Sequence, residues 1–241
     1  MVFLFASNEA VILLNSIFLI EECEAMARPY CQRCKKPEQV CLCSYLDPQE
    51  NAKAVIILRH PDERSKALGT ASLIELGLSK ALIVDALHFH HQEIRDLLLS
   101  FSCTEPLLIY PQPLNEEYPH YVFDFEKDRF TSLALQKTYD SIILLDGTWR
   151  NTRELLHCNS WLKRLPSLNL VNIGQSRYRI RQAKQEGAVA TIEAAAFALT
   201  LLDETFQADR LIKPFEKMIE FQIEKMGQSV YQVNYLQKEQ D

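Results

Sequence analysis

Four short, continuous apolar runs are the feature of this 241-residue sequence that most constrains its fold. Between or after these runs lie segments whose apolar residues have helical spacing. Strands that are apolar on both faces are typical of parallel sheets covered by helices on each side. The sequence therefore predicts an α/β fold with a mostly parallel sheet flanked by helices. The apolar runs span residues 52–58, 81–84, 106–111 and 141–145. The predicted helices span residues 65–78, 92–101, 191–206 and 214–226.

Composition narrows the classes of function that such a domain can have. The chain has six glycines and neither a GxGxxG nor a GxxxxGK[ST] pattern, which argues against dinucleotide and P-loop sites. The formal net charge of −6 argues against a uniformly basic polyanion binder, although a local basic face remains compatible with it. The expected organisation is an apolar extension (1–25), a small cysteine-rich module (26–50) and one main domain (51–241).

The apolar extension has the wrong flanks for a targeting segment. Two asparagines and a glutamate interrupt the run Val2–Ile20, and no Lys or Arg precedes Arg28, so neither a membrane span nor a secretory signal is favoured. Two interpretations stay open, a translation start at Met26 and a peripheral amphipathic anchor. We expect a cytoplasmic protein without membrane association, because its cysteines also suit a reducing compartment.

The cysteine-rich module contains the pattern C-x2-C-x6-C-x-C, formed by Cys31, Cys34, Cys41 and Cys43. Four thiolates complete the tetrahedral shell of a structural zinc ion and leave no open position for catalysis. The alternative is two disulfides or a redox pair. A C-x-C spacing is unfavourable for disulfide geometry. A redox C-x-x-C motif normally lies beside a thioredoxin-type βαβ pattern, and that pattern is absent here. The sequence therefore predicts a structural zinc site.

Residues that could contact a ligand lie at the ends of three predicted strands. They are Arg59–Glu63, Tyr110–Pro111 and Asp146–Trp149. Ligands of parallel α/β sheets bind in the crevice beyond the carboxyl ends of the strands. We therefore expect these three strand ends to share one pocket.

Asp146 is the candidate general base of that pocket. It directly follows an apolar strand, Gly147 permits close backbone approach, and Trp149 offers a flat apolar wall, so desolvation would make the carboxylate more basic. The alternative is that Asp146 caps the helix that starts near Trp149. For His60 the alternative to a site role is likewise a helix cap.

Positive charge is concentrated further along the chain. Basic and apolar residues alternate over Arg177–Arg181, and Lys184 follows shortly after. A charge run of this kind is usually a solvated edge strand. Here it would form a local basic patch that the negative total conceals.

Taken together, these residues resemble the DTW-domain family over nearly nine-tenths of the chain. The resemblance is carried by the four cysteines and an ordered set of motifs. The motifs are His60-Pro-Asp-Glu63, Thr70-Ala71, Tyr110-Pro111, Asp146-Gly147-Thr148-Trp149, Tyr178-Arg-Ile-Arg181 and Thr191-Ile-Glu193-Ala194. The resemblance implies a SPOUT-like fold with a trefoil knot, a feature otherwise nearly absent from proteins.

The resemblance also implies an activity, that of a tRNA-uridine aminocarboxypropyltransferase. Such enzymes move the 3-amino-3-carboxypropyl group of S-adenosylmethionine to N3 of a uridine, typically in the tRNA variable loop, and release methylthioadenosine. The expected partners are tRNA and S-adenosylmethionine, with no obligate protein partner. Two rival hypotheses are a SPOUT-type RNA methyltransferase and a non-catalytic zinc-containing RNA-binding module.

Site roles follow from the motifs and the resemblance. Asp146 would act as the base, with Thr148 and Trp149 shaping the same pocket. The residues expected to hold S-adenosylmethionine are His60, Glu63, Thr70, Tyr110, Pro111, Leu145, Gly147, Tyr178, Arg181, Thr191 and Glu193. The residues expected to contact tRNA are Arg33, Lys35, Lys36, Arg150, Arg153, Arg177 and Arg179.

Overall fold

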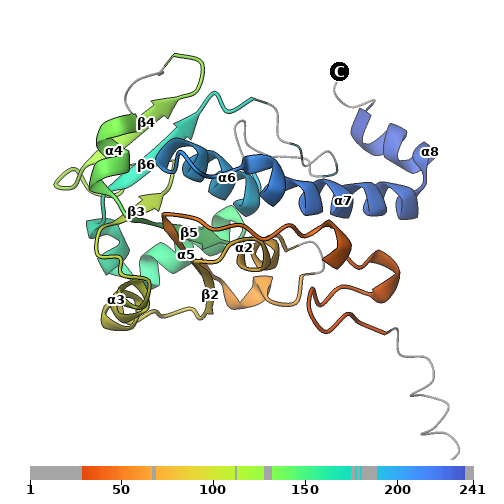
Figure 1. The fold of residues 1–241 in the computed structure, drawn as a ribbon, viewed down its shortest axis with the longest axis horizontal. Coiled ribbons are helices and arrows are strands. Elements are labelled where there is room, and N and C mark those ends of the chain that lie inside the picture. Colours follow the sequence, from red (N-terminus) through yellow and green to blue (C-terminus); the bar gives the residue numbers. More distant parts are fainter. Residues whose placement is uncertain are drawn as a thin grey trace, which may run out of the picture. The chain divides into compact units, whose positions relative to one another are not determined.

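The structure is a computed structural model that describes residues 29–66, 69–111, 113–127, 132–174, 177, 180 and 189–236 (Figure 1). The chain divides into two compact units, residues 1–41 and 42–241. In the first unit the described segment forms a tight turn, closed by an antiparallel bridge between Tyr30 and Pro37. A 3₁₀ turn, η1 (Glu38–Val40), follows it.

The second unit is built on six parallel strands in the order β2-β1-β5-β3-β6-β4. The predicted parallel sheet is therefore confirmed. Its bounds are β1 (Ala54–Arg59), β2 (Ala81–Asp85), β3 (Pro106–Ile109), β4 (His120–Asp124), β5 (Ser141–Asp146) and β6 (Ser167–Val171). The strands β4 and β6 were not expected from the sequence, since β4 has polar residues at both ends, His120 and Asp124, and Asn169 interrupts the apolar pattern of β6.

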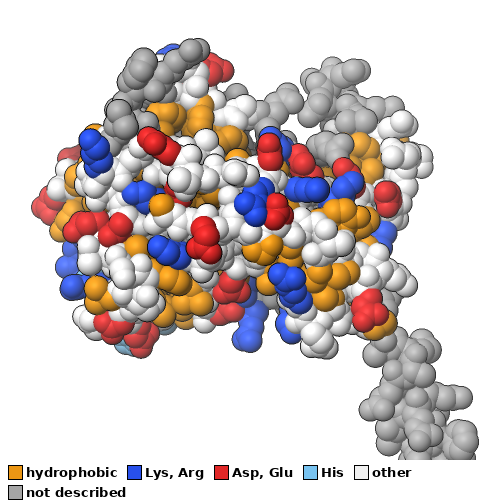
Figure 2. Space-filling model, viewed as in Figure 1, with side chains coloured by type: hydrophobic (Ala, Val, Ile, Leu, Met, Phe, Trp, Pro, Cys, Tyr) orange, Lys and Arg blue, Asp and Glu red, His pale blue; other side chains and the backbone are white. Residues whose placement is uncertain are grey.

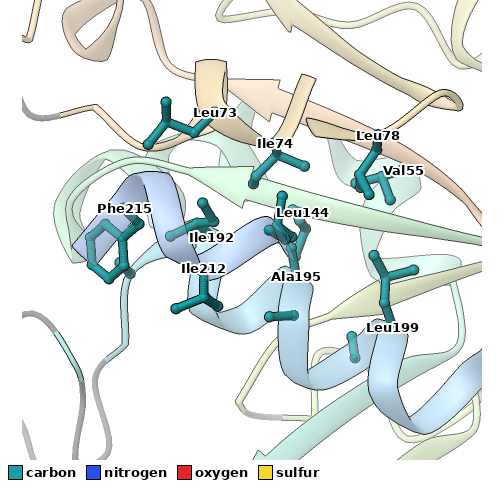
Figure 3. Packing of buried hydrophobic residues seen from close by; sticks show 14 of the residues in the cluster. Val55, Leu73, Ile74, Leu78, Leu144, Ile192, Ala195, Leu199, Ile212 and Phe215 are labelled. Atoms are coloured by element: carbon teal, nitrogen blue, oxygen red, sulfur yellow. The ribbon is translucent and has the colours of Figure 1, made fainter. Parts of the chain in front are cut away.

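Helices cover both faces of this sheet. Along β1, Val55 and Ile57 pack with α2, α6 and α7, whereas Ile56 and Leu58 face the other way and pack with α3 and α5. Figure 3 shows the first of these layers. The α-helices are α2 (Ala71–Gly77), α3 (His91–Ser100), α4 (Ser132–Thr138), α5 (Trp149–Cys158), α6 (Thr191–Leu202), α7 (Ala208–Met226) and α8 (Gln228–Tyr231). The shorter helical turns are η2 (Cys43–Tyr45), η3 (Pro61–Glu63), η4 (Ser160–Arg164) and the π-helical η5 (Gln232–Leu236).

Three of the four predicted helices differ from the structure by more than one residue at one end. The helix expected over 65–78 begins only at Ala71, because separate turns, such as that from Glu63 to Lys66, follow η3. The helix expected over 191–206 ends at Leu202, where Asp203 takes an extended conformation. The helix expected from Pro214 begins at Ala208, so this proline lies inside α7 although it donates no backbone hydrogen bond.

None of the helices within the described residues combines the length and the hydrophobicity that a membrane span requires. Residues 1–25, for which an anchor was one interpretation, lie outside the described part of the chain.

Candidate active site

The carboxyl ends of β3, β5 and β6 and the first turns of α5 and α6 enclose an open pocket of about 870 Å³. This volume includes space that is open to the solvent. The pocket confirms that Tyr110–Pro111 and the Asp146–Trp149 turn converge, as their positions after parallel strands predicted. Its lining residues are Ile109, Tyr110, Pro111, Leu144, Leu145, Gly147, Trp149, Thr152, Leu168, Asn169, Leu170, Ile173, Val189, Thr191 and Ala194.

Asp146 does not itself line this pocket, but its chain neighbours Leu145 and Gly147 and its hydrogen-bond partner Thr191 do. The residue is only 7% exposed, and its Oδ1 accepts a 2.5 Å hydrogen bond from Oγ1 of Thr191. Burial raises the pKa of the Asp146 carboxyl above its ordinary value, and the negative charge of Glu63 raises it further. The Thr191 hydrogen bond and the Arg59 charge act in the opposite direction. The site therefore holds a desolvated carboxylate with increased basicity.

The turn that follows Asp146 starts α5, but a different residue caps the helix. Oγ1 of Thr148 accepts a hydrogen bond from the backbone N–H of Asn151 at 3.2 Å, so the alternative that Asp146 is the cap is wrong. Gly147 is required by close packing, since a Cβ atom there would lie 2.9 Å from Cβ of Asn151. Trp149 remains 36% exposed at the pocket.

The third strand end, that of β1, does not line the pocket. The backbone N–H of His60 donates to the carbonyl oxygen of Asp146 at 3.0 Å, and its Nδ1 accepts from the backbone N–H of Asp62. His60 is thus the cap of η3, which was its alternative interpretation. Glu63 lies against the start of α5, and Thr70 is buried beside α2, so neither lines the pocket. Their contact with S-adenosylmethionine stays a prediction without support from this pocket.

Glu193 is almost completely buried and organises the entry to α6. One carboxylate oxygen accepts from the backbone N–H of Ala190 at 2.8 Å, and the other accepts from the backbone N–H of Arg177 at 2.6 Å. The side chain of Arg177 in turn forms an ion pair with Glu216 of α7, at 2.9 Å. The predicted site residues Tyr178, Arg179 and Arg181 lie outside the described residues.

Several lining residues were not found from the sequence. Asn169 and Leu170 belong to β6, which the sequence pattern did not reveal, and Thr152 and Ala194 lie one turn inside helices. The only available signal for Thr152 was its helical spacing of three residues from Trp149.

Basic side chains predicted to contact tRNA differ in their exposure. Arg150 and Arg153 are exposed on α5, and Nε of Arg153 donates to the carbonyl oxygen of Trp149 at 3.3 Å. Arg33 and Lys35 are exposed, whereas Lys36 is buried, which lowers its pKa although the nearby Cys34 acts in the opposite direction. Acidic and basic side chains are interspersed on the face drawn in Figure 2, in keeping with the net charge of −6.

The four cysteines of the N-terminal pattern lie together, with all Sγ atoms within 4.8 Å of one another. The Sγ atoms of Cys34 and Cys41 are 3.7 Å apart, close to the roughly 3.8 Å expected for two thiolates bound 2.3 Å from one tetrahedral zinc ion. None of the described cysteines forms a disulfide, which contradicts the alternative of two disulfides. The donor set and its spacing therefore fit one metal ion.

A parallel α/β domain with a pocket at its strand ends and a desolvated carboxylate beside that pocket is typical of α/β enzymes that act on small molecules. Residues 28–223 match the model of the DTW domain, and the chain belongs to the DTW domain family.

Curated relatives extend this comparison. The chain is 29% identical over 203 residues to tRNA-uridine aminocarboxypropyltransferase 2 of Drosophila melanogaster, which covers 82% of this chain and 76% of that protein. It is 28% identical over 218 residues to the Mus musculus protein of the same name, covering 88% and 70% respectively. It is 24% identical to tRNA-uridine aminocarboxypropyltransferase A of Arabidopsis thaliana, with 81% of each chain covered. No solved structure matches the chain.

Proposed function

We propose that this protein is a tRNA-uridine aminocarboxypropyltransferase, which transfers the 3-amino-3-carboxypropyl group of S-adenosylmethionine to N3 of a uridine. The observation that carries the proposal is the position of Asp146, a buried carboxylate with a raised pKa that is hydrogen-bonded to the pocket residue Thr191. The curated relatives, whose names state this activity, support it over most of the chain.

Asp146 would act as the general base. N3 of uridine carries a weakly acidic proton, which the Asp146 carboxylate would accept as N3 attacks the γ-carbon of the aminocarboxypropyl group. The new N3–C bond forms as the C–S bond breaks, and the electron pair of the broken bond stays on sulfur in the neutral thioether methylthioadenosine. No oxyanion develops, so the protein's main contribution is to align the two substrates.

The pocket would hold S-adenosylmethionine between the ends of β3 and β5 and the start of α6. Tyr110, Leu145 and Thr191 support this placement, because they line one cavity next to Asp146. Tyr178 and Arg181 are proposed to complete the pocket from the segment before α6. Glu193 would shape that segment through its hydrogen bond to the backbone of Arg177.

The first turn of α5 would receive the target uridine. Enzymes that modify a base take it out of its stack, and an extruded base stacks on an aromatic side chain. Trp149 offers a partly exposed ring at the pocket, and Arg150 and Arg153 place two cations beside it for the phosphate backbone. Among the basic residues before the sheet, the exposed Arg33 and Lys35 suit tRNA contact better than the buried Lys36.

The four-cysteine cluster would bind zinc in a structural role, because four sulfur ligands leave no open position. A SPOUT-type trefoil knot is also proposed. The insertion of β5 between β1 and β3, and of β6 between β3 and β4, supports it, because late strands occupy central places in the sheet. We further propose that the protein works in the cytoplasm, because none of the described cysteines forms a disulfide and cytosolic thiols are kept reduced.

Nucleoside mass spectrometry tests this function directly. Unmodified tRNA would be incubated with the protein and S-adenosylmethionine labelled either in the methyl group or in the aminocarboxypropyl carbons. Label from the aminocarboxypropyl carbons in a modified uridine is expected, together with methylthioadenosine. Methyl label in the RNA would instead identify a methyltransferase, and binding without any modification would identify a non-catalytic RNA-binding module.

A further inference from the structure

Glu63 makes a set of contacts that a residue of the S-adenosylmethionine pocket would not need. Its side chain is only 11% exposed, and it does not line the pocket. Its Oε1 accepts hydrogen bonds from the backbone N–H of Thr148 at 3.3 Å and from Nδ2 of Asn151 at 3.2 Å. The ammonium group of Lys66 lies 2.5 Å from the same oxygen. Three donors, two of them from the start of α5, thus converge on one carboxylate.

The start of α5 needs such a partner. The helix has no acidic residue in its own first turn, although a negative charge there would interact favourably with the helix dipole and the free N–H groups. The residue before Thr148 is Gly147, whose backbone is less restrained than that of any other residue. An acceptor from outside the helix therefore restrains the turn that carries both Asp146 and Trp149.

We propose that Glu63 is a positioning residue for the transfer reaction, which holds the turn Asp146–Trp149 in place through the backbone N–H of Thr148 and the side-chain amide of Asn151. This inference rests on the proposed function and assigns to the end of β1 a role different from contact with the cofactor. Glu63 touches neither substrate, and it acts through Thr148 and Asn151.

Because Glu63 is held against the turn that carries Asp146, its negative charge also acts on Asp146. The groups that face Asp146 are Thr191 from α6, Glu63 from η3, Arg59 from the end of β1 and Lys66 from the next turn. Arg59 is already engaged by both carboxylate oxygens of Asp85, and Lys66 by Glu63 itself. Removal of the Glu63 charge should lower the pKa of Asp146, because it removes the nearby negative charge that raises this pKa.

Two substitutions separate position from charge. Glu63→Gln keeps an oxygen acceptor for Thr148 and Asn151 but removes the charge, whereas Glu63→Ala removes both. We expect Glu63→Ala to lower kcat by about 10- to 100-fold, because a small misplacement of reacting groups has effects of this size. We expect Glu63→Gln to recover most of kcat and to move the acid limb of the kcat–pH profile to lower pH. Asp62→Asn is the matched control, since this exposed neighbour loses the same charge and has no bond to α5.

The affinity for S-adenosylmethionine discriminates the proposal from the role that the sequence suggested. Unchanged affinity in both Glu63 variants supports positioning, whereas weaker binding with an unchanged kcat would make Glu63 a cofactor ligand and overturn the proposal. A wild-type pH profile in Glu63→Gln would also overturn it. If Glu63→Ala does not fold, the Gln variant still decides.

Failure of the proposed function can be distinguished from failure of this inference. Wild-type protein that modifies no uridine would reject the function. The pKa of the Asp146 carboxyl, measured by carbon-detected NMR in the wild type and in Glu63→Gln, needs no turnover. A lower pKa in the variant supports the inference, and an equal pKa rejects it.

Discussion

Substitution of Asp146 by asparagine separates the catalytic role of this residue from its structural role. Asparagine has nearly the same shape, and its Oδ1 can still accept the hydrogen bond from Thr191. It cannot act as a base at neutral pH. Because general-base catalysis contributes typically 10²–10⁴-fold, kcat should fall by that factor, which corresponds to about 2.7–5.4 kcal/mol.

The same substitution should not destabilise the fold. The raised pKa of Asp146 determines how the stability of the wild type changes with pH. At pH values below an ordinary aspartate pKa of about 3.9, Asp146 is protonated in both the folded and the unfolded state. As the pH rises from there to the raised folded pKa, the unfolded chain releases its proton first, so the wild type loses stability. Above the folded pKa the loss is complete, and Asp146→Asn should be more stable than the wild type by a constant amount.

Single-turnover transfer to tRNA and thermal unfolding from acid to neutral pH measure the two effects. The expected result is a large loss of activity in a variant whose Tm is equal to that of the wild type at low pH and higher near neutral pH. A variant that retains activity to within about tenfold would refute Asp146 as the base. A variant that is less stable at neutral pH would refute the desolvation argument.

Three further substitutions test neighbouring parts of the site. Thr191→Val removes the hydrogen bond that lowers the pKa of Asp146, so the acid limb of the kcat–pH profile should move to higher pH; an unmoved limb would contradict this. Gly147→Ala places a Cβ atom 2.9 Å from Cβ of Asn151 and should lower the free energy of unfolding by about 1–3 kcal/mol in chemical denaturation, whereas an unchanged value would show that the turn can relax. Cys34→Ser should reduce the bound zinc measured by elemental analysis and lower the Tm of the protein, and a metal-free wild type would exclude the zinc site.

The sequence predicted the central strands well, because β1 and β5 are buried on both faces and therefore read as uninterrupted apolar runs. It did not predict β4 and β6. Asn169 breaks the apolar run of β6, and Val122 of β4 is more than half exposed at the edge of the sheet. Strands with exposed positions resemble loops in a sequence until their partners are known.

The sequence predicted those site residues that the ends of parallel strands bring together. It did not predict contacts that depend on the direction of individual side chains. Tyr110 and the Asp146 turn meet at the same pocket, as predicted from their positions at the carboxyl ends of parallel strands. The contacts of Glu63 could not be predicted, because they depend on how η3 turns after β1 to meet α5. Asp146 was weighed as the cap of the helix near Trp149, because aspartate is a preferred cap residue, but the backbone geometry of the turn selects Thr148.

A crystal structure with S-adenosylmethionine tests the central claim most directly, namely that one pocket at the carboxyl ends of β3, β5 and β6 performs the transfer. The account predicts that the ligand occupies this pocket between Tyr110, Leu145 and Thr191, with its aminocarboxypropyl group directed towards Asp146. Ligand bound instead beside His60 and Thr70, with Asp146 out of reach of the transferred group, would contradict the account.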